Sequence, residues 1–280
     1  MPSVTVIIPT YNRSGILKIA VDSVLNQTWQ DFELIVVDDG STDDTAEMIA
    51  VHYSKRVRYI QQENRGPAAA RNTGIDAASH GLIAFLDSDD RFDKKKLAIQ
   101  VAAMHQAPEF LVSHTQEIWF RRGMFLNQKK KHRKENGYIF ERCLELCAVG
   151  MSTIMVRKKL FDEVGTFDER LPCCEDYDLW LRASVRHPFL LVDHPLTIKE
   201  GGRPDQLSWQ HRVGMDRLRI YSIRNLMESG KLQGEQLSMA ARELVRKCLI
   251  YGEGCMKHGR EREGKEYLEM AEKVRGAVVF

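Results

Sequence analysis

Short apolar runs that end in polar or turn-forming residues recur along the first part of the chain. They fall at residues 4–8, 32–37, 57–60 and 82–86, and their β-branched and other apolar side chains predict buried strands. The intervening segments carry apolar residues at helical spacing, as at Leu17, Val21 and Val24. Because strand and helix alternate, the pattern predicts an α/β fold with a doubly wound, mostly parallel sheet flanked by helices.

Several segments carry signals for the start of a helix. Ser14 is predicted to cap the first helix, and the sequence Ser-Thr-Asp-Asp at 41–44 matches a capping box that opens the second. A third helix is expected to start at Gly66 and Pro67, since proline is tolerated in a first turn. Residues 93–104 predict a fourth helix, directly after the strand at 82–86.

The regular alternation ends after residue 105. Residues 110–120 predict one or two strands, 121–136 a basic loop without periodicity, and 151–156 a further strand. Short helices are expected at 158–164, closed by Gly165, and from residue 175 onward. From residue 215 the apolar spacing is helical to the end of the chain, which predicts an extension that packs on the sheet or forms a dimer surface.

Composition and charge narrow the class of protein. The 280 residues carry 41 Lys or Arg and 39 Asp or Glu, so the net charge of +2 gives no general attraction to nucleic acid. No run approaches the roughly 20 apolar residues of a membrane-spanning helix, and no secretion signal is apparent, so we expect a cytoplasmic protein. The six cysteines show neither zinc-finger spacing nor a compact disulfide framework.

Acidic residues follow two of the predicted strands. Asp38 and Asp39 follow the second, and Asp87, Ser88 and Asp89 follow the fourth. Open α/β sheets bind ligands at the carboxyl ends of their strands. Asp87 and Asp89, with one residue between them, suit a hard cation such as Mg²⁺ or Mn²⁺ that bridges them to phosphate. Asp38 and Asp39 suit the hydrogen-bond donors of a nucleoside. Turns that use Asp and Ser as helix caps are the alternative at both places.

Two further helix starts carry candidate chemistry. Residues 64–72 place small side chains and Arg71 at a helix N-terminus, which favours phosphate, although a helix packed closely on the sheet would need the same small residues. Glu175 and Asp176 open another helix, where a carboxylate can act as a general base or stabilise the helix dipole. Residues 178–180 are expected to be structural.

Together these segments resemble the family-2 glycosyltransferases with the GT-A fold. Five motifs carry the resemblance, at residues 6–12, 36–43, 64–74, 86–90 and 175–180, and it covers roughly residues 3–212. It implies an inverting enzyme that moves one sugar from a nucleoside-diphosphate sugar, with UDP-sugars favoured, to a hydroxyl of a saccharide or lipid-linked glycan. The GT-A domain would span 1–212, with a nucleotide-binding half to about 105 and an acceptor half from about 106, and 213–280 would be a helical C-terminal extension.

The resemblance also implies roles for individual residues. Asp176 would be the catalytic base, with Glu175 beside it, and Asp87 and Asp89 would form the D-x-D pair that holds the ribose and a Mn²⁺ or Mg²⁺ ion. The residues expected to bind the sugar nucleotide are Thr10, Asp38, Asp39, Asn64, Arg71, Asp87, Ser88, Asp89 and Arg203.

Two departures from the family pattern stand out. Many relatives carry a metal-binding His after the final strand, whereas this chain has Arg203 there, which cannot bind a metal but can contact diphosphate. His211 is the nearby candidate for the third metal ligand. The Q-x-x-R-W motif of processive polysaccharide synthases is absent, which favours transfer of a single sugar.

Other classes of protein fit less well. A receiver domain would place its acidic pair after the first strand, and a nucleotidyltransferase would carry a Gly-rich basic loop there, unlike residues 10–13. A catalytically inactive homologue that binds sugar nucleotides or a partner stays open. The basic stretch at 121–134 suits an anionic acceptor, either a lipid-linked phosphate at the membrane surface or an acidic saccharide, and a solvated loop is the alternative. The protein is expected in the cytoplasm, with the inner face of the membrane as a further location. Peripheral membrane association and a homodimer through the C-terminal helices are further expectations.

Overall fold

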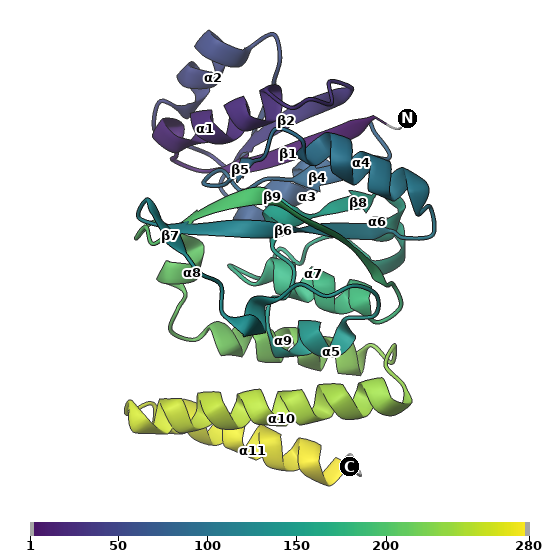
Figure 1. The fold of residues 1–280 in the computed structure, drawn as a ribbon. Coiled ribbons are helices and arrows are strands. Elements are labelled where there is room, and N and C mark those ends of the chain that lie inside the picture. The colour runs from purple at the N-terminus through teal and green to yellow at the C-terminus, as the bar shows by residue number, and fades with distance from the viewer. Residues whose placement is uncertain (1–2, 278–280) are drawn as a thin grey trace.

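The structure is a computed structural model that describes residues 3–277. It confirms the predicted α/β class, since one sheet is flanked by helices on both faces and further helices form an outer layer (Figure 1). Residues 1–2 and 278–280, which include the end of the predicted C-terminal extension, lie outside the described part of the chain.

The described residues form a nine-stranded sheet in the order β3-β2-β1-β4-β8-β6-β9-β5, with β7 paired to β6. The strands are β1 (Val4–Thr10), β2 (Phe32–Asp38), β3 (Arg58–Gln61), β4 (Leu82–Phe85), β5 (Arg91–Phe92), β6 (Val112–Arg121), β7 (Met124–Leu126), β8 (Met155–Arg157) and β9 (Phe189–Gly201). The first four are parallel, as predicted. Beyond β4 the prediction of a mostly parallel sheet needs correction, because only β6 and β9 pair in parallel there and β8, β7 and β5 pair antiparallel.

Helices account for most of the remaining chain. They are α1 (Ser14–Leu25), α2 (Thr45–Tyr53), α3 (Pro67–Ala77), α4 (Lys96–Gln106), α5 (Phe140–Glu145), α6 (Lys159–Val164), α7 (Glu175–Ser184), α8 (Leu207–Gln210), α9 (Met215–Glu228), α10 (Gly234–Lys257) and α11 (Glu261–Ala277), with single 3₁₀ turns η1 (Lys130–His132) and η2 (Met151–Thr153). The predicted helices at 158–164 and from 175 are confirmed, and the fourth helix begins at Lys96 rather than at residue 93.

The core has two parts, one on each face of the sheet. Alternate side chains of a strand point to opposite faces, so Val6 and Ile8 of β1 pack under α1 and α4, whereas Ile7 faces α3. Helix α3 lies very close to the sheet, since a Cβ added at Gly74 would be 2.4 Å from Ile7 Cγ2. The predicted close packing of this small-residue helix is therefore confirmed.

The two predicted helix caps are wrong. The Ser41 hydroxyl accepts a hydrogen bond from the Asn12 N–H (2.8 Å) instead of capping α2, and α1 has no side-chain cap of its own. Asp43 serves both helices, because its carboxylate accepts from the N–H groups of Ser14 (3.0 Å) and Thr45 (3.1 Å). The loop after β2 folds back toward the start of α1, and this contact between distant segments is invisible in local sequence.

Two segments of the second half also differ from expectation. The predicted strand at 151–156 begins with the turn η2, where the Thr153 hydroxyl and N–H both bond to the Gly150 carbonyl, and becomes strand β8 only at Met155. The basic loop at 121–136 contains β7, which pairs with the end of β6 as a hairpin. The segment 110–120 forms one strand, β6.

The C-terminal helices pack on the helical layer and not directly on the sheet. In Figure 1, α10 and α11 form the outermost layer, next to α9 and α5. Ile220 and Ile223 of α9 and Leu244 of α10 belong to the same core cluster as Trp180 of α7. No helix within residues 3–277 combines the length and the apolar character needed to cross a membrane.

Candidate active site

The carboxyl ends of β1, β2 and β4 bring the first predicted site residues together. Thr10 of β1 pairs with Asp38 of β2, and the Asp39 N–H donates to the Thr10 carbonyl (2.9 Å). On the other side of β1, the Leu86 N–H donates to the Ile7 carbonyl, so the chain enters Asp87 beside the same strand. Thr10 Oγ1 is buried and has no hydrogen-bond partner in the described structure. These residues therefore line one edge of the sheet, as predicted.

Asp38 and Asp39 have different surroundings. Asp38 is fully buried, and its carboxylate accepts from the Ser41 N–H (2.7 Å) and from the Tyr59 hydroxyl. Asp39 holds the following loop by accepting from Gln62 Nε2 (2.7 Å) and from two backbone N–H groups, at residues 65 and 66. A carboxylate has about four acceptor positions, and these three bonds occupy three of those of Asp39.

Asn64 belongs to the loop that Asp39 holds, and it lies against the turn after β2. Gly40 has a positive φ of 82°, and a Cβ added to it would be 2.9 Å from the Asn64 nitrogen. Only glycine fits this turn without strain. The Asn64 side chain is exposed at the rim of the strand ends.

Arg71 connects Asp87 at the end of β4 with Glu175 at the start of α7. Its Nη2 lies 2.8 Å from Asp87 Oδ1 and its Nη1 forms an ion pair with Glu175, although Arg71 itself is only 6% exposed. Burial opposes ionisation of Asp87, but Arg71, Lys199 and Arg13 together lower the pKa of that carboxyl. Burial raises the pKa of Glu175, against the attraction of Arg71. Arg71 is thus committed to protein carboxylates, and the predicted phosphate contact would have to compete with them.

Asp176 is the more accessible acid at the start of α7. It is half-buried, whereas Glu175 is buried. Asp176 Oδ1 accepts from the Tyr177 N–H (2.7 Å) and Oδ2 lies 3.1 Å from Cys147 Sγ. Burial and the charge of Asp176 hold the pKa of Cys147 well above its usual value, so the thiol stays protonated and donates. Cys147 thereby orients one carboxylate oxygen of Asp176.

Asp89 is surrounded by cationic and amide groups from loops. Arg13 Nη1 lies 3.5 Å from its Oδ1, and Arg203 Nη2 (3.4 Å) and Gln206 Nε2 (3.0 Å) approach its Oδ2. Arg13 also donates to the hydroxyl of the buried Ser88 (3.2 Å). Arg203 therefore lies beside the D-x-D pair, and its predicted contact with diphosphate stays a prediction.

The donor set fits a cation held by Asp89 together with a ligand's phosphates. Carboxylate oxygens are hard ligands, and Mg²⁺ commonly takes one or two of them and completes its shell with phosphate oxygens and water. In this structure the guanidinium groups of Arg13 and Arg203 balance the charge of Asp89, so a metal ion bound there would have to displace them. Residues 3–277 contain no group of three or more His, Cys, Asp or Glu side chains that could hold a metal ion, so His211 does not join Asp87 and Asp89 in a preformed cage.

Behind the D-x-D pair lies a buried polar layer that the sequence analysis missed. The Asp87 N–H donates to Ser152 Oγ (3.1 Å), and that hydroxyl donates to Asp90 (2.6 Å). Lys199 Nζ is 3.8 Å from Asp90, and burial raises the pKa of Asp90 to about 8 despite this neighbour. Cys147, Ser152 and Gln206 lie far along the chain from the acids that they contact, so no local motif announces them.

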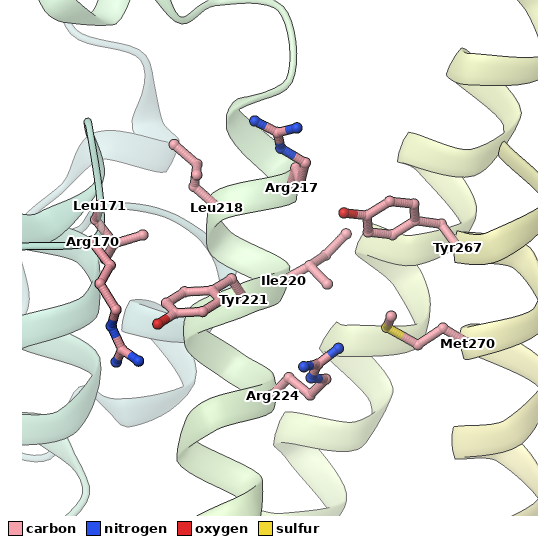
Figure 2. Close-up of a pocket in the computed structure, with 9 residues that line it drawn as sticks. All are labelled: Arg170, Leu171, Arg217, Leu218, Ile220, Tyr221, Arg224, Tyr267 and Met270. Atoms are coloured by element: carbon pink, nitrogen blue, oxygen red, sulfur yellow. The ribbon is translucent and has the colours of Figure 1, made fainter. Parts of the chain in front are cut away.

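A cavity of about 450 Å³ lies elsewhere, between α9, α11 and the segment before α7 (Figure 2). None of the predicted site residues lines it, so the strand ends are the candidate active site. The residues that line the cavity are Arg170, Leu171, Arg217, Leu218, Ile220, Tyr221, Arg224, Tyr267 and Met270.

The sheet gathers carboxylates at its strand ends, beside a helix-borne acid and several arginines, at the place where open α/β sheets bind their ligands. The chain belongs to glycosyl transferase family 2, whose model matches residues 5–165. The predicted family is therefore confirmed.

Curated relatives agree with this assignment. An uncharacterized glycosyltransferase of Rickettsia felis is 38% identical over 201 residues, which cover 69% of this chain and 32% of the relative. The Escherichia coli UDP-Glc:alpha-D-GlcNAc-diphosphoundecaprenol beta-1,3-glucosyltransferase WfgD is 31% identical over 182 residues, covering 64% of this chain and 68% of that protein. The match thus spans about a third of the length of the Rickettsia felis relative.

Solved structures confirm the GT-A type of fold. S. aureus TarS 1-349 in complex with UDP-GlcNAc superposes with a TM-score of 0.68 at 21% sequence identity, over 88% of this chain and 72% of that one. At this identity the likeness establishes the fold alone.

Proposed function

We propose that this chain is an inverting glycosyltransferase that moves one sugar from a UDP-sugar to a hydroxyl of a saccharide or lipid-linked glycan. The observation that carries the proposal is the placement of Asp176, a half-buried carboxylate at the start of α7, beside a buried Arg71 that reaches the strand-end Asp87. Family membership, the printed activity of WfgD and the UDP-GlcNAc complex of TarS support the choice of a sugar nucleotide as donor.

Asp176 acts as the general base. It takes the proton of the acceptor hydroxyl while that oxygen bonds to the anomeric carbon of the sugar. The bond from this carbon to the diphosphate oxygen breaks, UDP leaves with the electron pair, and the configuration inverts. The Cys147 thiol and the Tyr177 N–H each bond one oxygen of Asp176 and fix its orientation for this transfer. Glu175 helps indirectly, because its pairing with Arg71 anchors the start of α7.

Residues at the strand ends bind the donor. Asp39 keeps an acceptor position for a base or ribose donor group, and Thr10 and Asn64 lie beside it. Arg13 and Arg203 stand against Asp89 and can turn toward the charge that develops on the leaving diphosphate. A Mn²⁺ or Mg²⁺ ion bound by Asp89, with Asp87 close by, would supply further Lewis-acid stabilisation of that charge.

A nucleotide-release assay on the purified chain tests the proposal. A panel of UDP-, GDP- and dTDP-sugars is incubated with Mn²⁺, with Mg²⁺ and with chelator. We expect UDP release from one UDP-sugar and a loss of about 10²–10⁴-fold in Asp176→Asn with UDP binding unchanged, since that is the usual contribution of a general base. Asp76→Asn, an exposed acid on α3, is the matched control.

The alternatives give different results. Binding of UDP without release from any donor would favour an inactive sugar-nucleotide-binding homologue. No nucleotide binding at all would contradict the proposal. Loss of activity with chelator would support the metal, whereas full activity with chelator would leave the arginines as the charge-stabilising groups. The boundary near residue 212, a cytoplasmic location and a homodimer through the C-terminal helices stay predictions.

A further inference from the structure

The short strand β7, which follows the turn of the β6–β7 hairpin, exposes three consecutive apolar side chains. Met124 is 72% exposed, Phe125 63% and Leu126 40%. Arg122 and Gly123 both have positive φ, 52° and 75°, and connect the strands in the tight turn typical of two-residue hairpins. We call Met124, Phe125 and Leu126 the hairpin tip. A contiguous group of exposed apolar side chains on a short strand marks a surface that another phase or molecule can cover.

The hairpin tip is apolar on both of its faces. Successive side chains of a strand point to opposite faces, so Phe125 points away from the face shared by Met124 and Leu126. Phe125 pairs with Phe120, and the two rings are 6.1 Å apart, whereas Leu126 pairs with Trp119 on the other face. A flat protein partner would cover one face of the hairpin. The interfacial layer of a bilayer surrounds an inserted hairpin and covers both faces.

The flanks of the hairpin tip carry only positive charge. Residues 121–133 contain no Asp or Glu. The exposed cations of this segment are Arg121, Arg122, Lys129, Lys130 and Arg133. Each basic side chain near an anionic bilayer gains about 1 kcal/mol, so the charge pattern favours acidic over zwitterionic lipids.

A second apolar group lies on the same side of the molecule. Figure 1 shows β7 and α8 at the same end of the sheet, and the hairpin turn contacts the chain just before α8. The Gly123 N–H donates to Glu200 Oε1 (2.8 Å) and the Arg122 N–H to the Gly201 carbonyl (3.1 Å). On α8, Trp209 is 46% exposed, and Arg212 stacks on its ring at 4.4 Å. A tryptophan beside an arginine is the side-chain pair that membrane interfaces favour.

We propose that the hairpin tip and Trp209 form a docking surface for an anionic lipid bilayer. The tip inserts its apolar side chains between the headgroups, the basic flanks contact lipid phosphates, and Trp209 lies at the same interface. The segment between β9 and α8, which holds Asp89 through Arg203 and Gln206, then lies next to the membrane. This surface goes beyond the proposed sugar transfer and is tested without it.

Vesicle co-sedimentation of the full chain tests the docking surface. Vesicles of phosphatidylcholine alone are compared with vesicles of equal parts phosphatidylcholine and phosphatidylglycerol, at low and high salt. We expect binding only to the anionic vesicles, weakened by salt. Met124→Ser/Phe125→Ser should reduce the binding constant about tenfold or more, because it removes most of the inserted apolar area. Lys129→Ser/Lys130→Ser should reduce it by a similar factor through lost charge.

Matched variants separate the surface from general stickiness. Val51→Ser/Ile250→Ser removes two equally exposed apolar side chains from α2 and α10 and should leave vesicle binding unchanged. A second measurement does not depend on whether the hairpin variants fold. Brominated phosphatidylglycerol in the vesicles should quench the tryptophan fluorescence of the wild type, and it should quench that of Trp209→Phe less.

Three results would overturn the proposal. They are no binding to anionic vesicles, equal loss in the control variant, and unchanged quenching in Trp209→Phe. If sedimentation equilibrium shows self-association that the tip variants abolish while vesicle binding is absent, the surface is a protein interface instead.

Discussion

Asp87 and Asp89 are two residues apart, yet their charges are balanced in opposite ways. Asp87 is paired at 2.8 Å with Arg71, which projects from a helix packed on the sheet and has a side chain only 7% exposed. Asp89 meets Arg203 at 3.4 Å, and the Arg203 side chain is 25% exposed and belongs to a loop. The arginine of the first pair is buried, although the Asp87 side chain is 26% exposed, whereas the arginine of the second pair is the more exposed partner of Asp89. We therefore expect Asp87 to be fixed by the fold and Arg203 to be the group that a ligand can displace.

The largest effect should come from breaking the buried pair. Arg71→Met leaves the carboxylates of Asp87 and Glu175 without their cation, and removing one partner of a buried ion pair costs about 3–5 kcal/mol. We expect a loss of this size in the free energy of unfolding at pH 7.5, measured by urea denaturation. The loss should shrink toward pH 5, because the unpaired carboxylates can then take up protons.

A matched variant shows whether burial is responsible. Arg65→Met removes an arginine whose side chain is 53% exposed and lies 3.5 Å from Glu169, so its cost should stay within about 1 kcal/mol. Arg71→Met/Glu175→Gln should recover part of the stability by removing one orphaned charge. Equal losses in Arg71→Met and Arg65→Met would contradict the distinction between the two kinds of pair.

Lys96 is a buried cation that, unlike Arg71, has no carboxylate close to it in the described part of the chain. Lys96 is fully buried, and its Nζ bonds to Gln100 Oε1 (2.6 Å) and the Thr153 carbonyl (3.0 Å). Burial lowers the pKa of Lys96 to about 7, against the attraction of Glu117. The unfolded chain therefore binds more protons between about pH 7 and 10.5, and the stability that Lys96 contributes rises with pH across that window.

Lys96→Met should remove this pH dependence. We expect the variant to match or exceed the wild type in unfolding free energy at pH 6 and to fall behind by about 1–3 kcal/mol near pH 9.5, since deprotonated Lys96 keeps its hydrogen bonds there. Urea denaturation across this range measures both curves. Lys95→Met, at the neighbouring exposed position, should run parallel to the wild type. Parallel curves for Lys96→Met would mean that Lys96 is not titrating in the folded protein.

The sequence predicts the local part of this site and not its long-range partners. The acids at 38–39 and 87–89 follow short apolar runs, so strand ends and their order could be inferred from pattern alone. The sequence places Arg71 at a helix start but does not show that it pairs with Asp87. Its second partner, Glu175, is 104 positions away along the chain. The Cys147–Asp176 contact joins positions 29 apart in the half of the chain where alternation ends. Such pairs depend on tertiary packing, which no local motif records.

The same reason explains the errors in the fold. Ser14 and the box at 41–44 have the composition of caps, but Asp43 reaches both helix starts because the loop after β2 folds back toward the start of α1. The strand predicted at 151–156 fails where Thr153 bonds back to Gly150. Local propensity favours these caps and this strand, but tertiary contacts override it.

The smallest effect on stability should come from replacing Arg203. This variant tests the Arg203–Asp89 pair, as Arg71→Met tests the Arg71–Asp87 pair. In Arg203→Ala, Asp89 keeps Arg13 and Gln206, so the free energy of unfolding should change by no more than about 1 kcal/mol. UDP binding, measured by titration calorimetry with chelator present, should nevertheless weaken about tenfold, because a charge-assisted contact to diphosphate is worth roughly 1.5–3 kcal/mol. Adding Mn²⁺ should reduce this difference if Asp89, once released, accepts the ion. A stability loss as large as that of Arg71→Met, with UDP binding unchanged, would show that Arg203 supports the fold and that both acids of the motif are structural.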